Sequence, residues 1–249
     1  MDPLAINIKN LSFNYPGNPT QLFTNFNIKI TAGERFGLFG PNGAGKTTLM
    51  NLMTGLLSFH IGSIQLFGNE IKNHNKSINN LFGLIPQDLS LYQELSSLEN
   101  LEFFGAWSGL HKQQIKSQAI KLFDSLGLTK LQHIPVHKLS SGMKRKVNLA
   151  IGVIHNPKIL FLDEPTVGVD VQTRLTIIDF LKDLNKNGTT LIYTSHQLVE
   201  AERLCKSVAL IDEGKIIVHD DLSRLLSQHG KGGLEELFLN LTGKDYRNQ

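Results

Sequence analysis

The chain has 249 residues, of which 41% are hydrophobic, so it is long enough to bury a full core as one α/β domain. Its 25 Lys and Arg residues against 22 Asp and Glu residues give a formal charge of +3, which neither indicates nor excludes a nucleic-acid partner. A single cysteine, Cys205, excludes an internal disulfide and fits a reducing compartment, and the start Met1-Asp2-Pro3 lacks the basic and apolar runs of a secretion signal.

The first part of the chain predicts strands followed by a loop rich in glycine. Alternating apolar and polar residues favour two antiparallel strands over Ala5–Phe13 and Phe23–Ile30, with turn residues between them. A short buried strand over Glu34–Phe39 leads into Gly40–Thr48, which reads GPNGAGKTT and fits the pattern G-x-x-x-x-G-K-[ST]. A helix is expected to begin near Thr47. A phosphate-binding loop requires this context of strand, loop and helix. The alternative interpretation of the same residues is a glycine-rich turn that binds no ligand.

The residues of this loop have separate expected roles in holding phosphate. Glycines let the backbone turn its N–H groups toward an anion, and the following helix adds the positive end of its dipole. Lys46 is expected to reach the terminal phosphates, the Thr47 hydroxyl to hold Mg²⁺, and Thr48 to donate to a phosphate oxygen further back. The other predicted contacts are Gly40, Asn42, Gly43, Ala44 and Gly45. The loop alone indicates a nucleoside triphosphate, without indicating the reaction.

The middle of the chain changes from strand to helix patterns. Short strands are expected over Ser63–Phe67 and Leu81–Ile85, and Ser97–Ile154 is helical in pattern. Apolar residues recur there at helical spacing, most of them expected in the core: Leu98, Leu101, Phe104, Trp107, Ile115, Ala119, Leu122, Phe123 and Leu126. We therefore interpret 88–152 as a helical subdomain inserted into an α/β core.

The last part of the chain alternates strands with helices, which predicts a parallel sheet covered on both faces. Strands are expected over Lys158–Leu162, Thr189–Thr194, Val208–Asp212 and Ile216–Val218, and helices over Gln172–Asn187, Leu198–Leu204 and Leu234–Leu241. The residues Gly230–Gly233 are expected to form a short joint before the last helix. The most apolar stretches are too short to span a bilayer, so any membrane span would have to come from another chain.

Further chemistry-bearing residues follow these predicted elements. Asp163 and Glu164 end an apolar strand, where ligands bind in open α/β sheets; Asp163 is expected to hold Mg²⁺ and Glu164 to polarise a water for attack on the γ-phosphate. Gln87, after a strand, is a candidate ligand for Mg²⁺ or water. Ser140-Ser141-Gly142 opens a helix and is a candidate anion site, and His196 could hydrogen-bond the γ-phosphate. Read alone, each of these last three features has an ordinary structural explanation.

In this order the motifs resemble those of the ATP-binding subunits of ABC transporters. The resemblance covers nearly the whole chain, and its residues are Tyr15, Gly40–Thr48, Gln87, Leu139–Met143, Ile159–Glu164, Gly168-Val169-Asp170 and His196. The signature loop Leu139–Met143 departs from the family's Leu-Ser-Gly-Gly-Gln at Ser141 and Met143. Two stretches, Asp212–Ile216 and Leu234–Leu239 through Thr242-Gly243, resemble the subfamily that serves ABC-2 type exporters.

The resemblance implies a fold, a site and partners. The implied fold is an α/β P-loop NTPase core, with a mostly parallel sheet and flanking helices, an antiparallel β subdomain at the N-terminus and an inserted α-helical subdomain. The implied division is 1–87 and 153–229 for the core, 88–152 for the helical subdomain and 230–249 for a C-terminal helix and tail. ATP and Mg²⁺ are the implied ligands, with adenine stacked on Tyr15 and the signature residues Ser140, Ser141 and Gly142 closing the ATP site of a second subunit.

The same resemblance implies an ATPase bound to integral membrane permease subunits at the cytoplasmic face of the cell membrane. The partner subunit is a second copy or a related ATPase, and no nucleic acid is expected. Soluble ABC ATPases of chromosomes or ribosomes remain an alternative, although the first carry a long coiled coil and the second usually carry two cassettes. An ABC importer is another alternative, whereas a phosphate-loop kinase or helicase does not account for Ser140-Ser141-Gly142 together with His196.

Overall fold

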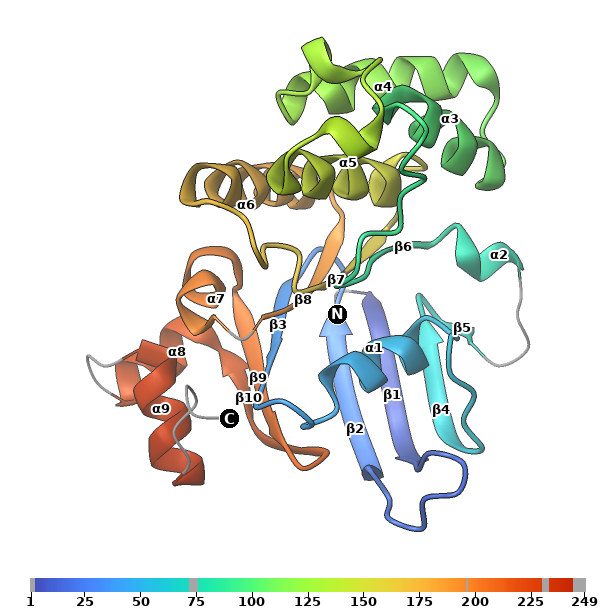
Figure 1. Ribbon diagram of the computed structural model, residues 1–249. Helices are drawn as coiled ribbons and strands as arrows, with labels where there is room; N and C mark the ends of the chain where they lie inside the picture. Colours follow the sequence, from blue (N-terminus) through green and yellow to red (C-terminus); the bar gives the residue numbers. More distant parts are fainter. Residues whose placement is uncertain (1–2, 72–75, 196, 230–232, 244–249) are drawn as a thin grey trace.

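The computed structural model describes residues 3–71, 76–195, 197–229 and 233–243, which form two sheets with helices around them (Figure 1). The first sheet is antiparallel, with the strand order β2-β1-β4-β5. Its strands are β1 (Leu4–Phe13), β2 (Phe23–Thr31), β4 (Ile61–Leu66) and β5 (Asn69–Glu70). The predicted antiparallel pair at the start of the chain is confirmed, because Ile8 pairs with Ile28 in the register of β1 and β2.

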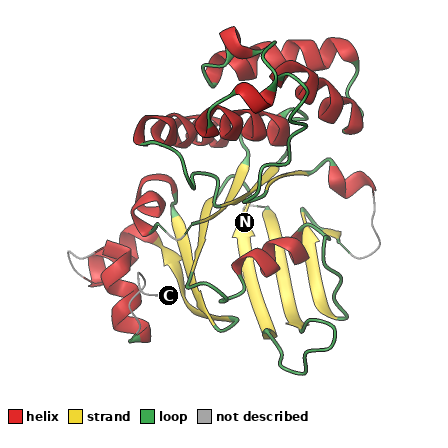
Figure 2. Cartoon of the chain, in the orientation of Figure 1, coloured by secondary structure: helices red, strands yellow, loops and turns green. Residues whose placement is uncertain are grey.

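The second sheet has the strand order β10-β9-β3-β8-β7-β6, and all its pairings are parallel except that of β10 with β9. Its strands are β3 (Arg35–Phe39), β6 (Phe82–Ile85), β7 (Ile159–Asp163), β8 (Thr190–Thr194), β9 (Ser207–Asp212) and β10 (Lys215–Asp221). The predicted mostly parallel sheet is therefore confirmed. Figure 2 shows the two sheets below a layer of helices.

Strand β7 explains why a central strand of this sheet is apolar at consecutive positions. Leu160 and Leu162 pack into a core on the helical side of the sheet. Ile159 and Phe161 point the other way, into a second core shared with the antiparallel sheet and α1 (Lys46–Met53). Successive side chains of a strand face opposite sides, so a strand covered on both faces needs apolar residues throughout.

Most of the remaining helices lie in two groups (Figure 1). Helices α3 (Ser97–Trp107), α4 (Lys112–Ser125) and α5 (Ser141–Val153) gather at one end of the molecule, in the segment predicted as helical, above α6 (Val171–Lys186). The second group consists of α7 (Leu198–Leu204), α8 (Leu222–His229) and α9 (Gly233–Thr242), beside the β9–β10 hairpin. No helix in the described parts of the chain combines the length and hydropathy needed to cross a membrane.

Local sequence signals explain where several of these helices begin. Helix α3 opens with a capping box, in which Ser96 accepts from the N–H of Glu99 while the Glu99 carboxylate accepts from the N–H of Ser96. Helix α6 opens at Asp170, whose carboxylate accepts from the Thr173 N–H at 2.9 Å. These caps satisfy N–H groups that a helix leaves without internal partners.

Among the elements that the sequence pattern missed are α2 (Lys76–Asn79), β5 and α8. Helix α8 follows Asp221, whose carboxylate accepts from the N–H groups of Ser223 and Arg224, so a capping signal was present and was not used. Of the predicted joint before the last helix, residues 230–232 lie outside the described part of the chain. Most of the predicted helical apolar residues are buried, but Trp107 is 84% exposed.

Candidate functional site

The site begins at the loop between β3 and α1. Gly43 has φ +80° and Gly45 has φ +105°, in the left-handed region that glycine enters without strain. Gly40 lies so close to β9 that an added Cβ would fall 2.1 Å from the Ile211 carbonyl oxygen. The glycines therefore let the loop curl tightly against the sheet, as the motif predicts.

Lys46 lies in the first turn of α1 with its ammonium group inside this loop. It is 7% exposed, and its Nζ donates to the carbonyl oxygens of Gly40 at 2.7 Å and Pro41 at 3.0 Å. Burial lowers the pKa of Lys46 below its usual value, and the carboxylates of Glu164 and Asp163 oppose that shift. The loop thus holds a point positive charge beside two carboxylates.

Asp163 and Thr47 meet although they are 116 positions apart in the chain. The Thr47 hydroxyl donates to Asp163 Oδ2 at 2.9 Å, and the buried Thr194 hydroxyl donates to Asp163 Oδ1 at 2.6 Å. This arrangement presents hydroxyl and carboxylate oxygens, the hard donors that suit Mg²⁺. Within the described ranges, no group of three or more His, Cys, Asp and Glu side chains is arranged to hold a metal ion.

Glu164 follows β7 with an unusual backbone. Its φ is +50°, a left-handed value that residues other than glycine rarely adopt, and its side chain is 9% exposed. Its N–H donates to the Thr194 carbonyl oxygen at 3.2 Å, and Gln87 Nε2 lies 3.4 Å from its Oε2. The structure therefore brings together Gln87 and Glu164, two of the predicted catalytic residues.

Tyr15 lies at the outer edge of the same site and is 42% exposed. Its ring packs edge-on against Phe13, with the centroids 5.1 Å apart, and its hydroxyl is 2.8 Å from the Thr48 hydroxyl. The ring is therefore accessible at the loop's rim. The sequence predicts a phosphate oxygen as the partner of the Thr48 hydroxyl, and in the structure this hydroxyl lies beside that of Tyr15.

These residues line one open pocket of about 1320 Å³. Its lining residues include Tyr15, Gly40, Asn42, Gly43, Gly45, Lys46, Thr47, Thr48, Gln87 and Glu164, together with Gln197, Val199 and Glu213. Ala44 of the loop is buried beneath them, and Asp163 lies behind Thr47. The predicted loop, strand-end and Gln87 residues are thus gathered at one place, while His196 lies outside the described residues.

The signature residues occupy a separate position at the start of α5. Ser140 caps that helix by accepting from the Met143 N–H at 3.3 Å, and the Ser141 hydroxyl donates to the Gly168 carbonyl oxygen at 3.5 Å. An added Cβ on Gly142 would fall 3.0 Å from the Thr173 hydroxyl oxygen of α6. None of Ser140, Ser141 and Gly142 lines the pocket.

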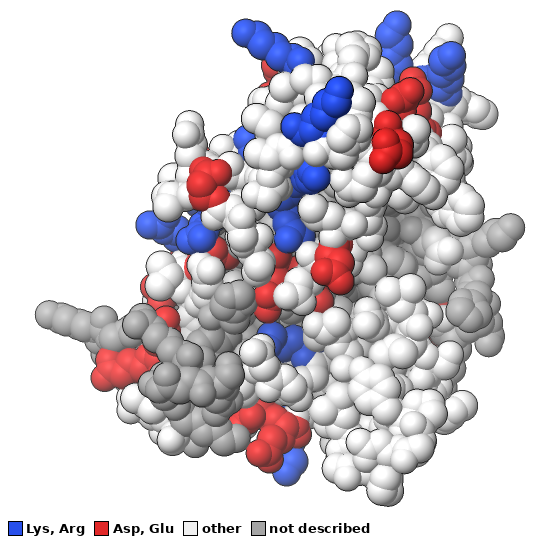
Figure 3. All heavy atoms as spheres, in the orientation of Figure 1, with Lys and Arg blue, Asp and Glu red and all other residues white. Residues whose placement is uncertain are grey.

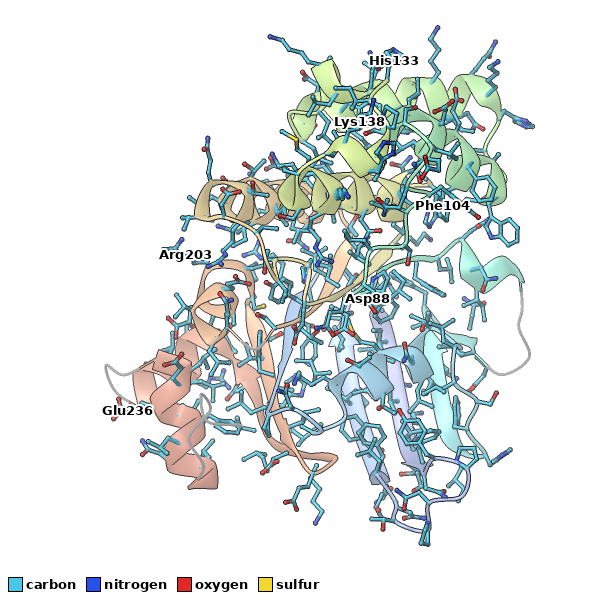
Figure 4. The ribbon with its side chains drawn as sticks, in the orientation of Figure 1. Asp88, Phe104, His133, Lys138, Arg203 and Glu236 are labelled. Carbon is cyan, nitrogen blue, oxygen red and sulfur yellow. The ribbon has the colours of Figure 1, made fainter. Side chains whose placement is uncertain are left out.

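Arg145 is a contact residue that the sequence patterns missed. It lies on α5, is 8% exposed, and donates from Nη1 to the Gln87 carbonyl oxygen at 2.8 Å and from Nη2 to the Val167 carbonyl oxygen at 3.5 Å. Burial lowers the pKa of Arg145, and the negative charges of Asp88 and Glu164 oppose that shift. Figure 4 shows Asp88 in the segment between β6 and α3. Through Arg145, helix α5 is hydrogen-bonded to the backbone of two segments beside the site, at Gln87 and at Val167.

The fold and the site define a P-loop nucleotide-binding protein, because a phosphate-binding loop and two strand-end carboxylates meet at one parallel sheet. A sequence profile described as "ABC transporter" matches residues 23–167, more than half of the 249 residues. The chain belongs to the ATP-binding subunits of ABC transporters, which are ATPases.

Individual relatives and solved structures agree with this family. The chain is 37% identical to the linearmycin resistance ATP-binding protein LnrL of Bacillus subtilis (strain 168) over 220 residues, covering 85% of this chain and 71% of the relative. It is 36% identical to the Nod factor export ATP-binding protein I of Sinorhizobium fredii (strain NBRC 101917 / NGR234) over 215 residues, covering 86% of this chain and 62% of that relative. The chain therefore spans less than two thirds of the second protein.

Two solved structures are similar along nearly the whole chain. One is an ATP-binding subunit of an ABC transporter, with a TM-score of 0.85, 26% identity and coverage of 96% of this chain and 99% of the other. The second is cbiO1 of Clostridium perfringens, described as part of the ABC transporter complex cbiONQ. Its TM-score is 0.83 and its sequence identity is 26%, and the alignment covers 97% of this chain and 96% of cbiO1.

Proposed function

We propose that this chain hydrolyses ATP to ADP and phosphate in a site shared by two head-to-tail subunits, and that the reaction drives export through a membrane permease. Lys46 binds the β- and γ-phosphates as a point charge, and Glu164 polarises the attacking water. Gln87 orients that water or a metal ligand, and His196 hydrogen-bonds the γ-phosphate. Tyr15 stacks on the adenine. The observation that carries this proposal is that Lys46, Glu164 and Gln87 line one pocket, with Asp163 held directly behind it by Thr47.

Mg²⁺ fits the same site through Thr47 and Asp163, with Gln87 nearby. The Thr47 hydroxyl oxygen and Asp163 Oδ2 are 2.9 Å apart. Mg²⁺ in such enzymes is bound by one or two carboxylates together with substrate phosphates. When bound, the ion would neutralise charge that develops on the phosphates. Thr194 would hold the Asp163 carboxylate in its orientation, because it donates to the oxygen that does not contact Thr47.

The position of the signature residues supports a site completed by a second subunit. The pocket of this chain is open and lacks Ser140, Ser141 and Gly142, although a helix N-terminus with small residues is suited to phosphate. A second copy, or a related ATPase, would bring its own α5 to the open side of the γ-phosphate. ATP would then bind between the phosphate loop of one subunit and the signature residues of the other.

Dilution of the isolated chain tests this arrangement. Turnover should rise faster than linearly with protein concentration, because two subunits are needed for one complete site. Glu164→Gln should bind ATP, lose turnover by roughly 10²–10⁴-fold and accumulate as a dimer in size-exclusion chromatography. Turnover strictly proportional to concentration, with a monomeric Glu164→Gln variant in ATP, would show a site complete in one chain.

Mixing two inactive variants gives a second test of the shared site. In a mixed dimer of Lys46→Ala and Ser140→Arg, one site has an intact loop and an intact signature, and the other has neither. We expect partial recovery of turnover in the mixture. The matched control mixes Lys46→Ala with Glu164→Gln, which leaves no site with both an intact lysine and an intact glutamate, so recovery there would contradict the arrangement.

The proposed permease contact lies in the subdomain 88–152, next to the core formed by 1–87 and 153–229. This proposal is supported by an aromatic surface beside α3. The ring centroids of Tyr92 and Phe103 are 4.8 Å apart, and those of Phe103 and Phe104 are 5.3 Å apart. Trp107, on the same helix, is 84% exposed. Figure 4 shows Phe104 on this side of the helical end. Exposed aromatic surfaces of this kind mark interaction sites.

Charge substitution tests that contact. Phe103→Glu combined with Trp107→Glu should abolish transport in the complete transporter while leaving the ATPase activity of the isolated chain intact. The control places the charge at Ile120, which is 60% exposed on α4. Transport at the wild-type level in the double variant would exclude this surface.

Export and location follow from the relatives and from the partner. The relatives include a Nod factor export protein and a linearmycin resistance protein, so we propose export as the direction. The chain would then be a peripheral protein at the cytoplasmic face of the cell membrane, held there by its permease, with the residues 230–249 as a C-terminal appendage. On the face drawn in Figure 3, Lys and Arg side chains lie among Asp and Glu side chains, over the helical end as well as over the sheets.

A further inference from the structure

Glu200 is a buried carboxylate at a point where four segments of the chain meet. It lies on α7, is 3% exposed, and its Oε2 accepts hydrogen bonds from the hydroxyls of Thr166 and Tyr193, each at 2.5 Å. Its Oε1 lies 3.0 Å from Arg174 Nε of α6, an ion pair whose N–H is not aligned for a hydrogen bond. Figure 1 shows α7 next to α6 near the ends of the central strands.

Ser195 joins the same cluster from the end of β8. Its hydroxyl is 3.5 Å from Glu200 Oε2 and accepts from the Gln197 N–H at 2.9 Å. Glu200 thus contacts the loop after β7, the end of β8 and helix α6 at once. A carboxylate is suited to this task because both its oxygens accept several hydrogen bonds.

One of these contacts bears directly on the residue proposed to polarise water. Thr166 lies two positions after Glu164, inside a turn in which the Val167 N–H donates to the Glu164 carbonyl oxygen at 3.3 Å. Glu164 has the left-handed φ of +50°, and such a backbone persists only where the surrounding structure holds it. The Glu164 N–H is held from one side by Thr194, and the Thr166 hydroxyl anchors the other side of the turn to Glu200.

The Tyr193 contact differs from the Thr166 contact in what it restrains. Tyr193 lies within β8, where pairing with β3 and with β7 already fixes its backbone. Its hydroxyl bond therefore connects α7 to a rigid sheet. Thr166 follows β7 outside any strand pairing, and its hydroxyl contacts the Tyr193 hydroxyl at 3.2 Å and the Glu200 carboxylate at 2.5 Å. The shorter of the two contacts is the one to a charged group, so the bond to Glu200 is the stronger restraint on this turn.

We propose that Glu200 is a positioning residue for ATP hydrolysis, acting through Thr166 to hold the left-handed turn that presents Glu164. Arg174 keeps the Glu200 carboxylate at this place by its charge. This inference rests on the proposed role of Glu164 as the residue that polarises water. A displacement of a reacting group by about 1 Å can cost on the order of 10²-fold in rate, so loss of this anchor should appear in kcat.

Three single substitutions in the full chain test the proposal, each assayed with Mg-ATP at the same protein concentration. Thr166→Val keeps the shape of the side chain and removes its hydroxyl; we expect kcat to fall about ten- to hundredfold with KM for ATP within about twofold. Thr166→Ser keeps the hydroxyl and should retain most of kcat. Tyr193→Phe removes the other hydroxyl from the same carboxylate oxygen, and with it the 3.2 Å contact to the Thr166 hydroxyl, but it keeps the bond from Thr166 to Glu200. It should lower the melting temperature with kcat within about threefold.

The outcomes separate positioning from general stability. If Thr166→Val and Tyr193→Phe lose kcat equally, in proportion to the decrease in their melting temperatures, Glu200 contributes only to stability and the proposal is overturned. Unchanged kcat in Thr166→Val would also overturn it. ATP binding by Thr166→Val, measured by quenching with a fluorescent nucleotide, verifies that the variant is folded.

Glu164→Gln, measured in parallel, distinguishes this inference from the function on which it rests. If Glu164→Gln hydrolyses ATP at the wild-type rate, the proposed function fails at that residue. If Glu164→Gln is inactive and Thr166→Val is fully active, only the positioning role of Glu200 fails.

Discussion

Thr194→Val tests whether the carboxylate of Asp163 is held in place by the sheet. The Thr194 side chain is fully buried at 0% exposure, and its hydroxyl donates to Asp163 Oδ1 at 2.6 Å. Valine has nearly the same shape, so the substitution leaves the packing in place. It removes the short bond to Asp163 and the longer contacts of the hydroxyl with the Glu164 N–H at 3.3 Å and the Leu162 carbonyl oxygen at 3.4 Å. Asp163 is itself 5% exposed, so solvent cannot replace the lost donor without rearrangement.

The expected loss follows from the chemistry of that bond. A hydrogen bond to a charged group contributes about 1.5–3 kcal/mol net, and the other oxygen of the Asp163 carboxylate keeps its bond from Thr47. For a chain of this size each 1 kcal/mol corresponds to about 2–4 °C, so we expect the melting temperature to fall by roughly 4–10 °C. The Glu164 N–H keeps its backbone partner, the Thr194 carbonyl oxygen, in this variant.

The assay is thermal unfolding followed by circular dichroism without nucleotide, supported by urea unfolding to obtain the free-energy difference. Thr194→Ser is the control, because it keeps the hydroxyl and loses one buried methyl, at a cost of about 1 kcal/mol. A melting temperature for Thr194→Val within about 1 °C of wild type, or above that of Thr194→Ser, would refute the reasoning.

Substitutions at three further positions address the nucleotide site and the core. Lys46→Ala should weaken ATP binding about ten- to hundredfold while the melting temperature changes little, measured by titration with ATP; equal affinities would contradict the loop assignment. Tyr15→Ala should weaken ATP binding by about 1 kcal/mol, whereas Tyr15→Phe keeps the ring and should be close to wild type; similar affinities of the two variants would exclude stacking. His155 donates from Nε2 to the Phe82 carbonyl oxygen at 3.0 Å, and burial lowers its pKa below 6.5, so the unfolded chain takes up a proton first as the pH falls. Stability should therefore decline below about pH 6.5, more steeply in wild type than in His155→Gln, as urea unfolding at several pH values would measure.

Local sequence patterns determined most elements and the residues of the phosphate loop. The loop could be predicted because its function requires glycines, a lysine and a hydroxyl at fixed spacing within a dozen residues. Strand β7 was predicted to within one residue because burial on both faces requires a continuous apolar run. Strand β5 was missed because it has only two residues, whereas helix α8 was missed although Asp221 provides a capping signal at its start.

Only the tertiary structure decided which distant side chains meet. Arg145 reads as a polar residue in a basic stretch, yet it is buried between Gln87 and Val167, since the packing of α5 directs it inward. Glu200 reads as an ordinary charged residue on a short helix, and its contacts with Thr166 and Arg174 join positions separated by 34 and 26 residues. Periodicity determines which face of an element is buried, but the partner across that face depends on how the sheet order places the elements, and no local pattern contains that order.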